Sequence, residues 1–498
     1  MLVIVSDLHL TDGTTSASVP PASFHLFADR LWDLAFRASW RTDGRYQPID
    51  SIDVLLLGDV LDIMRSARWL QTANRPWDGA TNPETIETIV AVTSDILEHN
   101  QESLSVLRQL ATDNTIGVPP ADQAGHPVYN AQPQPVPVDI RYMVGNHDWP
   151  LHVPGDTYTL LRHEVGRFLG LAHDASRPFP HDPLECDDLL EMLRRHNVVA
   201  RHGDVFDPIS FNEERDRASL GDAIVIDLTL RFVRQLVDEM ASDLPVAFLN
   251  ALSEIDNVRP LPLVPVWLEG LLERTCHQTV VRKQVKRIWD QTVTRMIADD
   301  FVNEVCRTGP ISIDSLVAAL MIGSRAPGDW ASSIRRWLCE TRGAASESYG
   351  QHALAEPDFR NRRARHIVYG HTHIAESVPL EASSADGFVL NQLYFNAGTW
   401  RNVHRPTYFD STAGEFIGAE SLTYLSFFQG DERQGRPYES WSGFVGSTAT
   451  EDHMRRVDPA RANPVGRQHV QEPGTHIGVA APHFSITPLP SQSAASRR

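Results

Sequence analysis

The sequence predicts an α/β protein that a long helical segment interrupts. Short apolar runs rich in β-branched residues, typical of buried strands, end in polar residues. Segments with helical periodicity separate several of these runs. From residue 211 to residue 365 the helical period continues without strands, so this stretch is expected to be an insertion into the α/β domain.

Length and composition limit the possible functions. The chain has 498 residues, too many for one minimal domain, and 42% of them are apolar, which is ample for a core. The formal net charge of −19 argues against a nonspecific nucleic-acid-binding protein, but a phosphate substrate stays possible because bound metals reverse the local field. No run reaches the roughly 20 apolar residues of a membrane span. The four cysteines match no zinc or disulfide framework, so a cytoplasmic location is expected.

Four regions are expected along the chain. Residues 1–210 and 366–430 would form the two parts of the core. Residues 211–365 would form a helical cap or a partner-binding insertion. Residues 431–498 are polar and rich in Pro, Ser, Gln and Arg, which predicts a disordered tail.

The first expected element is a strand at Leu2–Val5, a continuous apolar run. No basic segment precedes it, and Asp7 and His9 follow at once, so we expect a strand here and not a signal peptide. Residues two apart in an extended chain point to the same side, so this carboxylate and this imidazole could meet one cation. Alone, the pair is a weak signal.

A second buried strand is expected at Ile52–Leu57 and ends in Gly58 and Asp59. The glycine permits a sharp turn. It would leave Asp59 at the carboxyl edge of the strand, where open α/β sheets bind ligands. A turn with solvated carboxylates is the alternative when this motif is considered alone.

A third strand, at Val138–Val144, follows a long proline-rich connection and ends in Gly145-Asn146-His147-Asp148. The amide oxygen of Asn146 can ligate a metal without adding charge. His147 can donate a proton, and Asp148 can fix its tautomer.

Two further strands also deliver histidines to the edge of a sheet. Val198–Ala200 precedes His202-Gly203-Asp204, and His366–Tyr369 precedes Gly370-His371-Thr372-His373. The strands expected later in the chain, at Phe388–Phe395 and Ser421–Phe428, show more alternation of apolar and polar residues, as in an antiparallel sheet covered on one face. Helices are expected at Phe24–Trp40, Ile86–Leu110, Asp187–His196, Ile224–Met240, Val264–Leu272, Val280–Ile297, Ile313–Ile322 and Ile334–Thr341.

In order, the five motifs are Asp-x-His, Gly-Asp, Gly-Asn-His-Asp, His-Gly-Asp and Gly-His-Thr-His. Together they resemble those of the calcineurin-like metallophosphoesterases. The match covers the strand ends throughout residues 1–210 and 366–400, whereas the insertion and the tail lie outside it. The resemblance implies a four-layer αββα sandwich of two mixed β-sheets, with helices outside.

The resemblance also implies a site for two divalent metal ions. The mixture of imidazole, carboxylate and amide ligands favours Mn, with Fe, Zn or Co as alternatives. Asp59 would bridge the two ions. The first ion would take Asp7, His9 and His373, and the second would take Asn146, His202 and His371.

The implied reaction is hydrolysis of a phosphoester, with a metal-bridging hydroxide attacking phosphorus in line with the leaving group. His147 would stabilise the transition state or protonate the leaving oxygen, and Asp148 would orient it. Asp62, Asp204 and Thr372 are expected behind these residues. The expected substrate is a phosphorylated small molecule or a nucleotide-type compound, cleaved by a phosphatase or phosphodiesterase activity.

The run Ser6-Asp7-Leu8-His9-Leu10, with His202-Gly203-Asp204, also resembles the UDP-diacylglucosamine pyrophosphatases of lipid A synthesis. Those enzymes are much shorter and typically carry Gly-Asn-Arg-Asp where this chain has His147, so a lipid substrate is not assigned.

Two alternatives of other kinds remain. One is a metal-binding scaffold that binds protein partners through the insertion. The other is a nuclease of the same superfamily, which the acidic charge disfavours.

Overall fold

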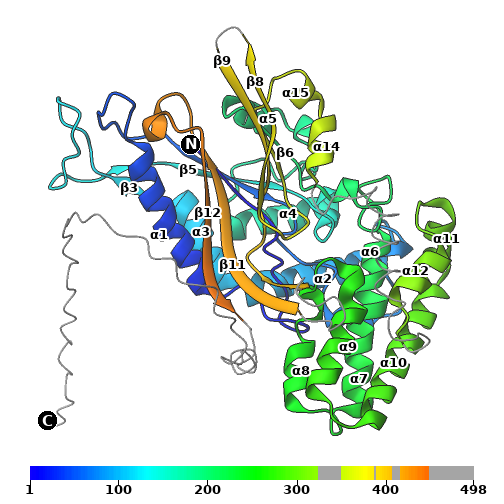
Figure 1. The fold of residues 1–498 in the computed structure, drawn as a ribbon. Helices are drawn as coiled ribbons and strands as arrows, with labels where there is room; N and C mark the ends of the chain where they lie inside the picture. The colour runs from blue at the N-terminus through cyan, green and yellow to red at the C-terminus, as the bar shows by residue number, and fades with distance from the viewer. Residues whose placement is uncertain (323–348, 386–387, 407–415, 448–498) are drawn as a thin grey trace, which may run out of the picture. The chain divides into compact units, whose positions relative to one another are not determined.

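The computed structural model describes residues 1–322, 349–385, 388–406 and 416–447. The larger of its two main sheets has the order β10-β11-β1-β2-β5, with β12 paired to β11 (Figure 1). Strands β1, β2 and β5 are parallel, and the other pairs are antiparallel. The strands are β1 (Leu2–Val5), β2 (Ile52–Leu57), β5 (Val138–Met143), β10 (Asn402–Pro406), β11 (Phe416–Phe427) and β12 (Tyr438–Ser447).

The smaller main sheet has the order β6-β7-β9-β8 and is also mixed. β6, β7 and β9 are parallel, and β8 runs antiparallel to β9. Its strands are β6 (Val198–Ala200), β7 (His366–Tyr369), β8 (Glu376–Ala385) and β9 (Phe388–Asn396). A separate pair, β3 (Gly117–Val118) and β4 (Gln134–Pro135), lies within the connection before β5.

Side-chain alternation in the strands explains why the two main sheets stack. In β1, Leu2 and Ile4 belong to a core shared with Val368 and Phe395 of the smaller sheet. The intervening Val3 belongs to a different core on the opposite face. Strands buried on both faces read as continuous apolar runs, which is the pattern of this sequence.

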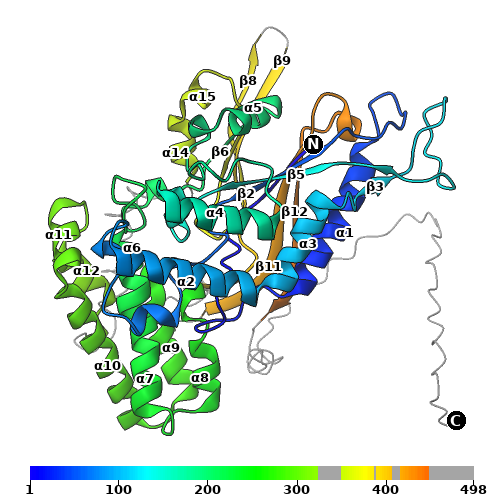
Figure 2. The same ribbon diagram turned by 180° about the vertical axis from the view of Figure 1, so that it is seen from behind.

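Helices form the two outer layers (Figure 2). On the larger sheet the apolar faces of four helices pack against side chains such as Val54 and Ile140. On the smaller sheet two short helices pack against Ile367 and Tyr394. The four-layer αββα prediction is therefore confirmed. The helices are α1 (Pro21–Ala38), α2 (Pro83–His99), α3 (Gln101–Thr112) and α4 (Asp156–Leu169) on the larger sheet, α14 (Gly350–Ala355) and α15 (Pro357–Arg360) on the smaller one, and α5 (Asp187–Arg195), which packs into the core between the sheets.

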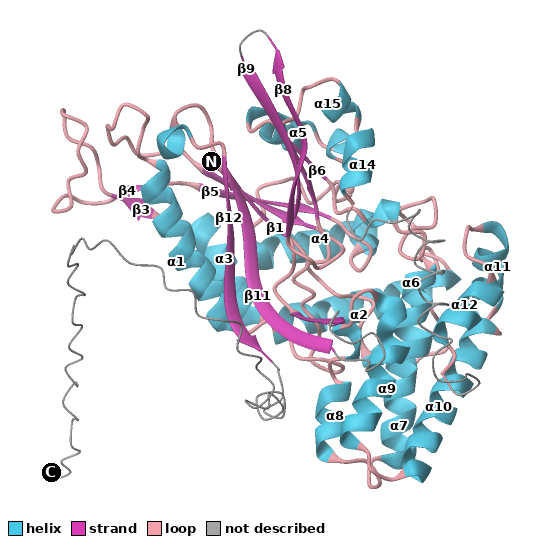
Figure 3. Ribbon diagram, in the orientation of Figure 1, coloured by secondary structure: helices cyan, strands magenta, loops and turns pink. Residues whose placement is uncertain are grey.

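The middle of the chain is helical, as predicted (Figure 3). It has its own apolar core around Phe232, Leu268 and Trp289. It meets the rest of the protein where Trp77 stacks on Phe301, with ring centroids 5.1 Å apart. Its helices are α6 (Leu220–Ala223), the π-helical η6 (Ile224–Leu230), α7 (Arg231–Met240), α8 (Val246–Leu252), α9 (Val264–Thr275), α10 (Thr279–Ile297), α11 (Asp300–Thr308) and α12 (Ile313–Leu320).

The prediction of a disordered tail over residues 431–498 is wrong for Tyr438–Ser447, which forms β12 and pairs with β11. The sequence pattern did not indicate this strand because an edge strand needs only one apolar face. In β12, Trp441 stacks on Tyr424, with ring centroids 5.2 Å apart. Residues 448–498 and the helix expected at Ile334–Thr341 lie outside the described residues. Among the described residues, no helix combines the length and apolarity that crossing a bilayer requires.

The core between the sheets contains an acid-sensitive residue, His366. Its ring lies against Phe427 and Tyr438, with centroids 5.0 Å and 5.4 Å away, and it is 3% exposed. Burial, and then the charge of Arg365, lower the pKa of His366 to about 4. In the unfolded chain this imidazole takes up a proton below about pH 6.5, whereas in the folded chain it stays neutral down to about pH 4. Acid therefore favours unfolding between these two values.

We predict that lowering the pH from 7 to 4.5 decreases the free energy of unfolding by about 2 kcal/mol less in His366→Phe than in the wild type. Urea unfolding of metal-free protein at both pH values measures it. The exposed His163→Phe is the control. An unchanged pH dependence in His366→Phe would contradict the prediction.

Candidate metal centre

The predicted site residues converge because the parallel strands that carry them end at the same edges. Backbone hydrogen bonds hold the loops after β1 and β2 together: Asp7 N–H donates to Gly58 O at 3.1 Å and His9 N–H to Asp59 O at 2.8 Å. The two sheets are joined here as well, since His371 N–H donates to the Asp7 carboxylate at 3.0 Å. Residues from distant parts of the chain thus share one site.

The backbone at the site is strained. Five of the seven predicted ligands have a left-handed conformation, which non-glycine residues rarely adopt. The extended geometry assumed for Asp7 and His9 is therefore wrong. Each of the two residues turns the chain, and these turns, not the alternation of a strand, bring the two side chains together. Backbone strain of this kind concentrates at functional sites. The φ angles are 56° at Asp7, 44° at His9, 52° at Asp59, 66° at His371 and 62° at His373.

One triad consists of Asp7, His9 and His373. The two Nε2 atoms of the histidines are 2.9 Å apart. The Asp7 Oδ1 atom lies 3.3 Å from His373 Nε2 and 3.7 Å from His9 Nε2. All three side chains are buried, so three ligand-type atoms point into one small space.

A second triad consists of Asp59, His202 and His371, with ligand-type atoms within 4.8 Å of one another. Asp59 Oδ2 is 3.2 Å from His202 Nε2 and also 3.6 Å from His9 Nε2, so this carboxylate lies between the two triads. The other nitrogen of His202 donates to the Leu57 carbonyl at 2.9 Å, which leaves Nε2 as the acceptor side of the ring.

The residues fit metal ions by two independent observations. First, Asp7 Oδ1, Asn146 Oδ1 and His202 Nε2 are buried and make no hydrogen bond within the described part of the chain. Second, the local field favours positive charge. Burial alone would lower the pKa of His202, but the charges of Asp59 and Asp7 raise it well above its usual value. The adjacent buried His and Asp triads could therefore bind metal ions.

His147 is oriented by Asp62 and not, as the sequence analysis expected, by Asp148. Asp62 Oδ1 bonds His147 Nδ1 at 2.6 Å, while its Oδ2 bonds His9 Nδ1 at 2.8 Å. Burial lowers the pKa of His147, but the charges of Asp62 and Asp59 outweigh it, so the net shift is upward.

Asp148 instead fixes the backbone of the loop. It accepts hydrogen bonds from Gly145 N–H at 2.6 Å, Val60 N–H at 2.8 Å and the Tyr142 hydroxyl at 2.6 Å. Burial and the neighbouring Asp59 raise the pKa of Asp148 to about 6.

The other residues expected behind the metal ligands, Asp204 and Thr372, differ in how they contact the site. Asp204 pairs with Arg215 at 2.6 Å, and Arg215 donates to the Gly145 carbonyl at 3.1 Å, so Asp204 supports the loop indirectly. Thr372 lines the same cavity as Asn146. Asp207, which was not assigned, lies 3.1 Å from His371 Nε2.

The sequence analysis missed the arginines at the site. Arg65 is 2% exposed and pairs with Asp62 at 3.1 Å and with Asp256 of the helical region at 3.3 Å. Arg259, also from the helical region, lies 3.2 Å from His373 Nε2. Arg401 donates to the His9 carbonyl at 3.0 Å. Isolated arginines carry no sequence signal for such a site, because only the tertiary fold brings them together.

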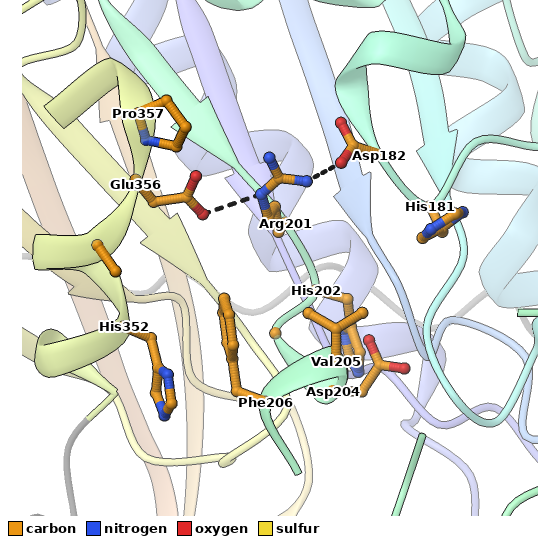
Figure 4. A pocket seen from close by; sticks show the side chains of 12 residues that line it. His181, Asp182, Arg201, His202, Asp204, Val205, Phe206, His352, Glu356 and Pro357 are labelled. Atoms are coloured by element: carbon orange, nitrogen blue, oxygen red, sulfur yellow. Dashed lines mark hydrogen bonds and ion pairs between the residues drawn. The ribbon is translucent and has the colours of Figure 1, made fainter. Parts of the chain in front are cut away.

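Two separate cavities have residues of this centre in their walls. The first is small, about 70 Å³, and its walls combine predicted site residues with Arg65, Arg259 and side chains of the helical region. The second is larger, about 320 Å³, and adjoins the site at His202 and Asp204 (Figure 4). The small cavity therefore connects the triads with the helical region.

Comparison with protein-family models finds no match, and comparison with curated proteins finds no relative. The chemistry of the site therefore rests on its own geometry.

Glycines make room for the ligand side chains. A Cβ at Gly145 would lie 2.7 Å from His202 Nε2, and one at Gly58 would lie 2.5 Å from His202 Nδ1. A Cβ at Gly370 would lie 2.6 Å from Asp7 Oδ2. Nothing larger fits at these three positions without displacing a ligand side chain.

We predict that Gly145→Ala weakens Mn²⁺ binding by at least about tenfold, because the new methyl group displaces His202 and Asp59. Isothermal titration calorimetry of metal-free protein measures the affinity. Gly166→Ala is the matched control, since its Cβ would meet only Ala175 at 3.8 Å. Equal affinities in the two variants would refute the steric argument.

Proposed function

We propose that the protein is a metal-dependent hydrolase of phosphoester bonds with a two-metal active site. One observation carries the proposal: Asp59 lies within 3.6 Å of a ligand-type nitrogen in each of two buried His and Asp groups. A carboxylate so placed is suited to bridge two cations. Asp7, His9 and His373 would hold one ion, and His202, His371 and Asn146 the other.

Two such ions supply a water of lowered pKa and neutralise the charge of a phosphoryl group. The imidazole, carboxylate and amide ligands suit Mn, Fe, Zn or Co. The role of the protein is to turn the Nε2 lone pairs of the histidines toward the site. His9 Nδ1 donates to Asp62 and His202 Nδ1 donates to the Leu57 carbonyl, which leaves Nε2 of each ring as the ligating nitrogen.

His147 is the proposed proton donor to the leaving oxygen. It lines the small cavity, and its Nδ1 is occupied by Asp62 at 2.6 Å, so Nε2 is the nitrogen available to a substrate. A scaffold without turnover would have no use for an imidazole held in this way, which favours an enzyme over the scaffold alternative.

Arg65 and Arg259 are proposed to bind the anionic substrate. Both line the cavity, and Arg259 is supplied by the helical region. Guanidinium groups bind phosphate oxygens through paired N–H donors. The helical region would thereby contribute to substrate choice, and a phosphorylated small molecule or nucleotide-type compound is the proposed substrate class.

We predict Mn²⁺-dependent hydrolysis of bis-p-nitrophenyl phosphate or p-nitrophenyl phosphate by the full chain, and at least about a 100-fold loss of kcat in His147→Ala. Metal content, measured by mass spectrometry, should be unchanged in that variant. The exposed His163→Ala is the control. Full turnover in His147→Ala would reject the assigned role, and no turnover in the metal-loaded wild type with either substrate would count against the proposed activity.

We also predict that Arg259→Met raises KM about tenfold or more, because a charge-assisted hydrogen bond to the substrate is lost. Steady-state kinetics on the same substrates tests this. Arg217→Met, at an exposed arginine paired with Glu214 at 2.8 Å, should leave KM unchanged. A KM in Arg259→Met equal to that of the control would exclude Arg259 from substrate binding.

A further inference from the structure

A second group of metal-ligand side chains lies outside the proposed active site: His152, His181 and Glu185, with Asp216 beside them. His152 ends the short helix η3 (Trp149–His152), a few residues after His147. His181 precedes and Glu185 ends the short helix η4 (Pro183–Glu185). The group therefore joins loops that are separate in the sequence.

One nitrogen of each histidine and the two carboxylate oxygens of Glu185 form a compact group. His181 Nδ1 is 2.9 Å from Glu185 Oε1 and 3.4 Å from His152 Nε2. His152 Nε2 is 3.4 Å from Glu185 Oε2. A tetrahedral zinc ion with bonds of about 2.0–2.1 Å requires ligand atoms about 3.3–3.4 Å apart. Two of the three separations match this value, and a small shift of Glu185 adjusts the third.

Hydrogen bonds to neighbouring groups orient His152 and Glu185, as is usual for the ligands of a metal site. Asp216 Oδ1 accepts from His152 Nδ1 at 2.5 Å, which directs the lone pair of Nε2 toward His181 and Glu185. Glu185 Oε2 accepts the backbone N–H of His181 at 3.0 Å, which fixes the carboxylate. The carboxylate–histidine pair is the usual support of a zinc-bound imidazole.

A simple ion-pair cluster explains these contacts less well. Two protonated histidines would place positive nitrogens 3.4 Å apart, whereas one dication shared by two neutral rings removes that repulsion. The side chains are 19%, 24% and 35% exposed at His152, His181 and Glu185, so an ion can reach them.

We infer that His152 Nε2, His181 Nδ1 and Glu185 bind one zinc ion, with the fourth position open to water. The ion links η3 (Trp149–His152), which follows Asn146 and His147, to the loop at 181–185. His181 also lines the larger cavity, near Asp182 and Arg201 (Figure 4). The proposed ion would therefore lie at the wall of this cavity. Its role is to position the loop that carries His147.

The test is zinc stoichiometry of the full chain, measured by mass spectrometry after metal-free protein is loaded with Zn²⁺ and gel-filtered. His181→Ala and Glu185→Gln should each hold one zinc fewer per chain than the wild type and His163→Ala. Glu185→Gln keeps an acceptor for the His181 amide, so it separates loss of the ligand from loss of the fold. Equal zinc content in the wild type and both variants would overturn the inference.

A second background separates this site from the proposed active site. In Asp59→Asn/His9→Ala/His202→Ala, which lacks the bridging carboxylate and one histidine of each proposed active-site ion, one zinc should remain, and Co²⁺ in its place should give the intense visible absorption of a tetrahedral ion. Adding His181→Ala should abolish both signals. If the proposed function is wrong and this inference is right, the wild type holds one zinc and the His181→Ala variant none. Persistence of the Co²⁺ signal in the variant that also carries His181→Ala would overturn the inference.

Discussion

The contact between Asp59 and the histidines on either side of it is the constraint on which the site depends. Its carboxylate lies 3.2 Å from His202 and 3.6 Å from His9, at 1% exposure. A buried carboxylate is costly unless positive charge compensates for it. The loops after β1, β2, β6 and β7 are arranged to supply that charge, first through imidazoles and, in the proposed function, through cations.

Meeting this constraint imposes a cost on the backbone. Left-handed conformations at residues such as Asp7, His9 and Asp59 cost about 1 kcal/mol or more each. The glycines at 58, 145 and 370 give up side-chain contacts so that ligands can approach. Stabilisation comes from elsewhere: the two main sheets bury nearly every apolar side chain of β1 and β2, and helices cover both outer faces. A rigid, well-packed sandwich holds the strained strand ends in place.

The helical region is tied to the site by charge as well as by packing. Arg65 connects Asp62, which orients His147, with Asp256 of the helical region. Arg259 enters the small cavity from the same region. A long insertion in the sequence is thereby connected to the proton donor of the proposed reaction by one short chain of ion pairs. The proposed zinc site at His152 would brace the same loop from its other end.

The sequence by itself determined the α/β class, the strands β1, β2, β6 and β7, and the residues that gather at the site, because buried strands and polar strand ends are local patterns. It did not give β12, whose polar residues form a strand only because β11 offers a pairing edge. It assigned Asp148, the nearest carboxylate in the chain, to His147. The tertiary structure gave that position to Asp62, which reaches both His9 and His147. The left-handed backbone, the arginines and the His152 cluster were likewise decided only by the fold, because each depends on segments that are far apart in sequence.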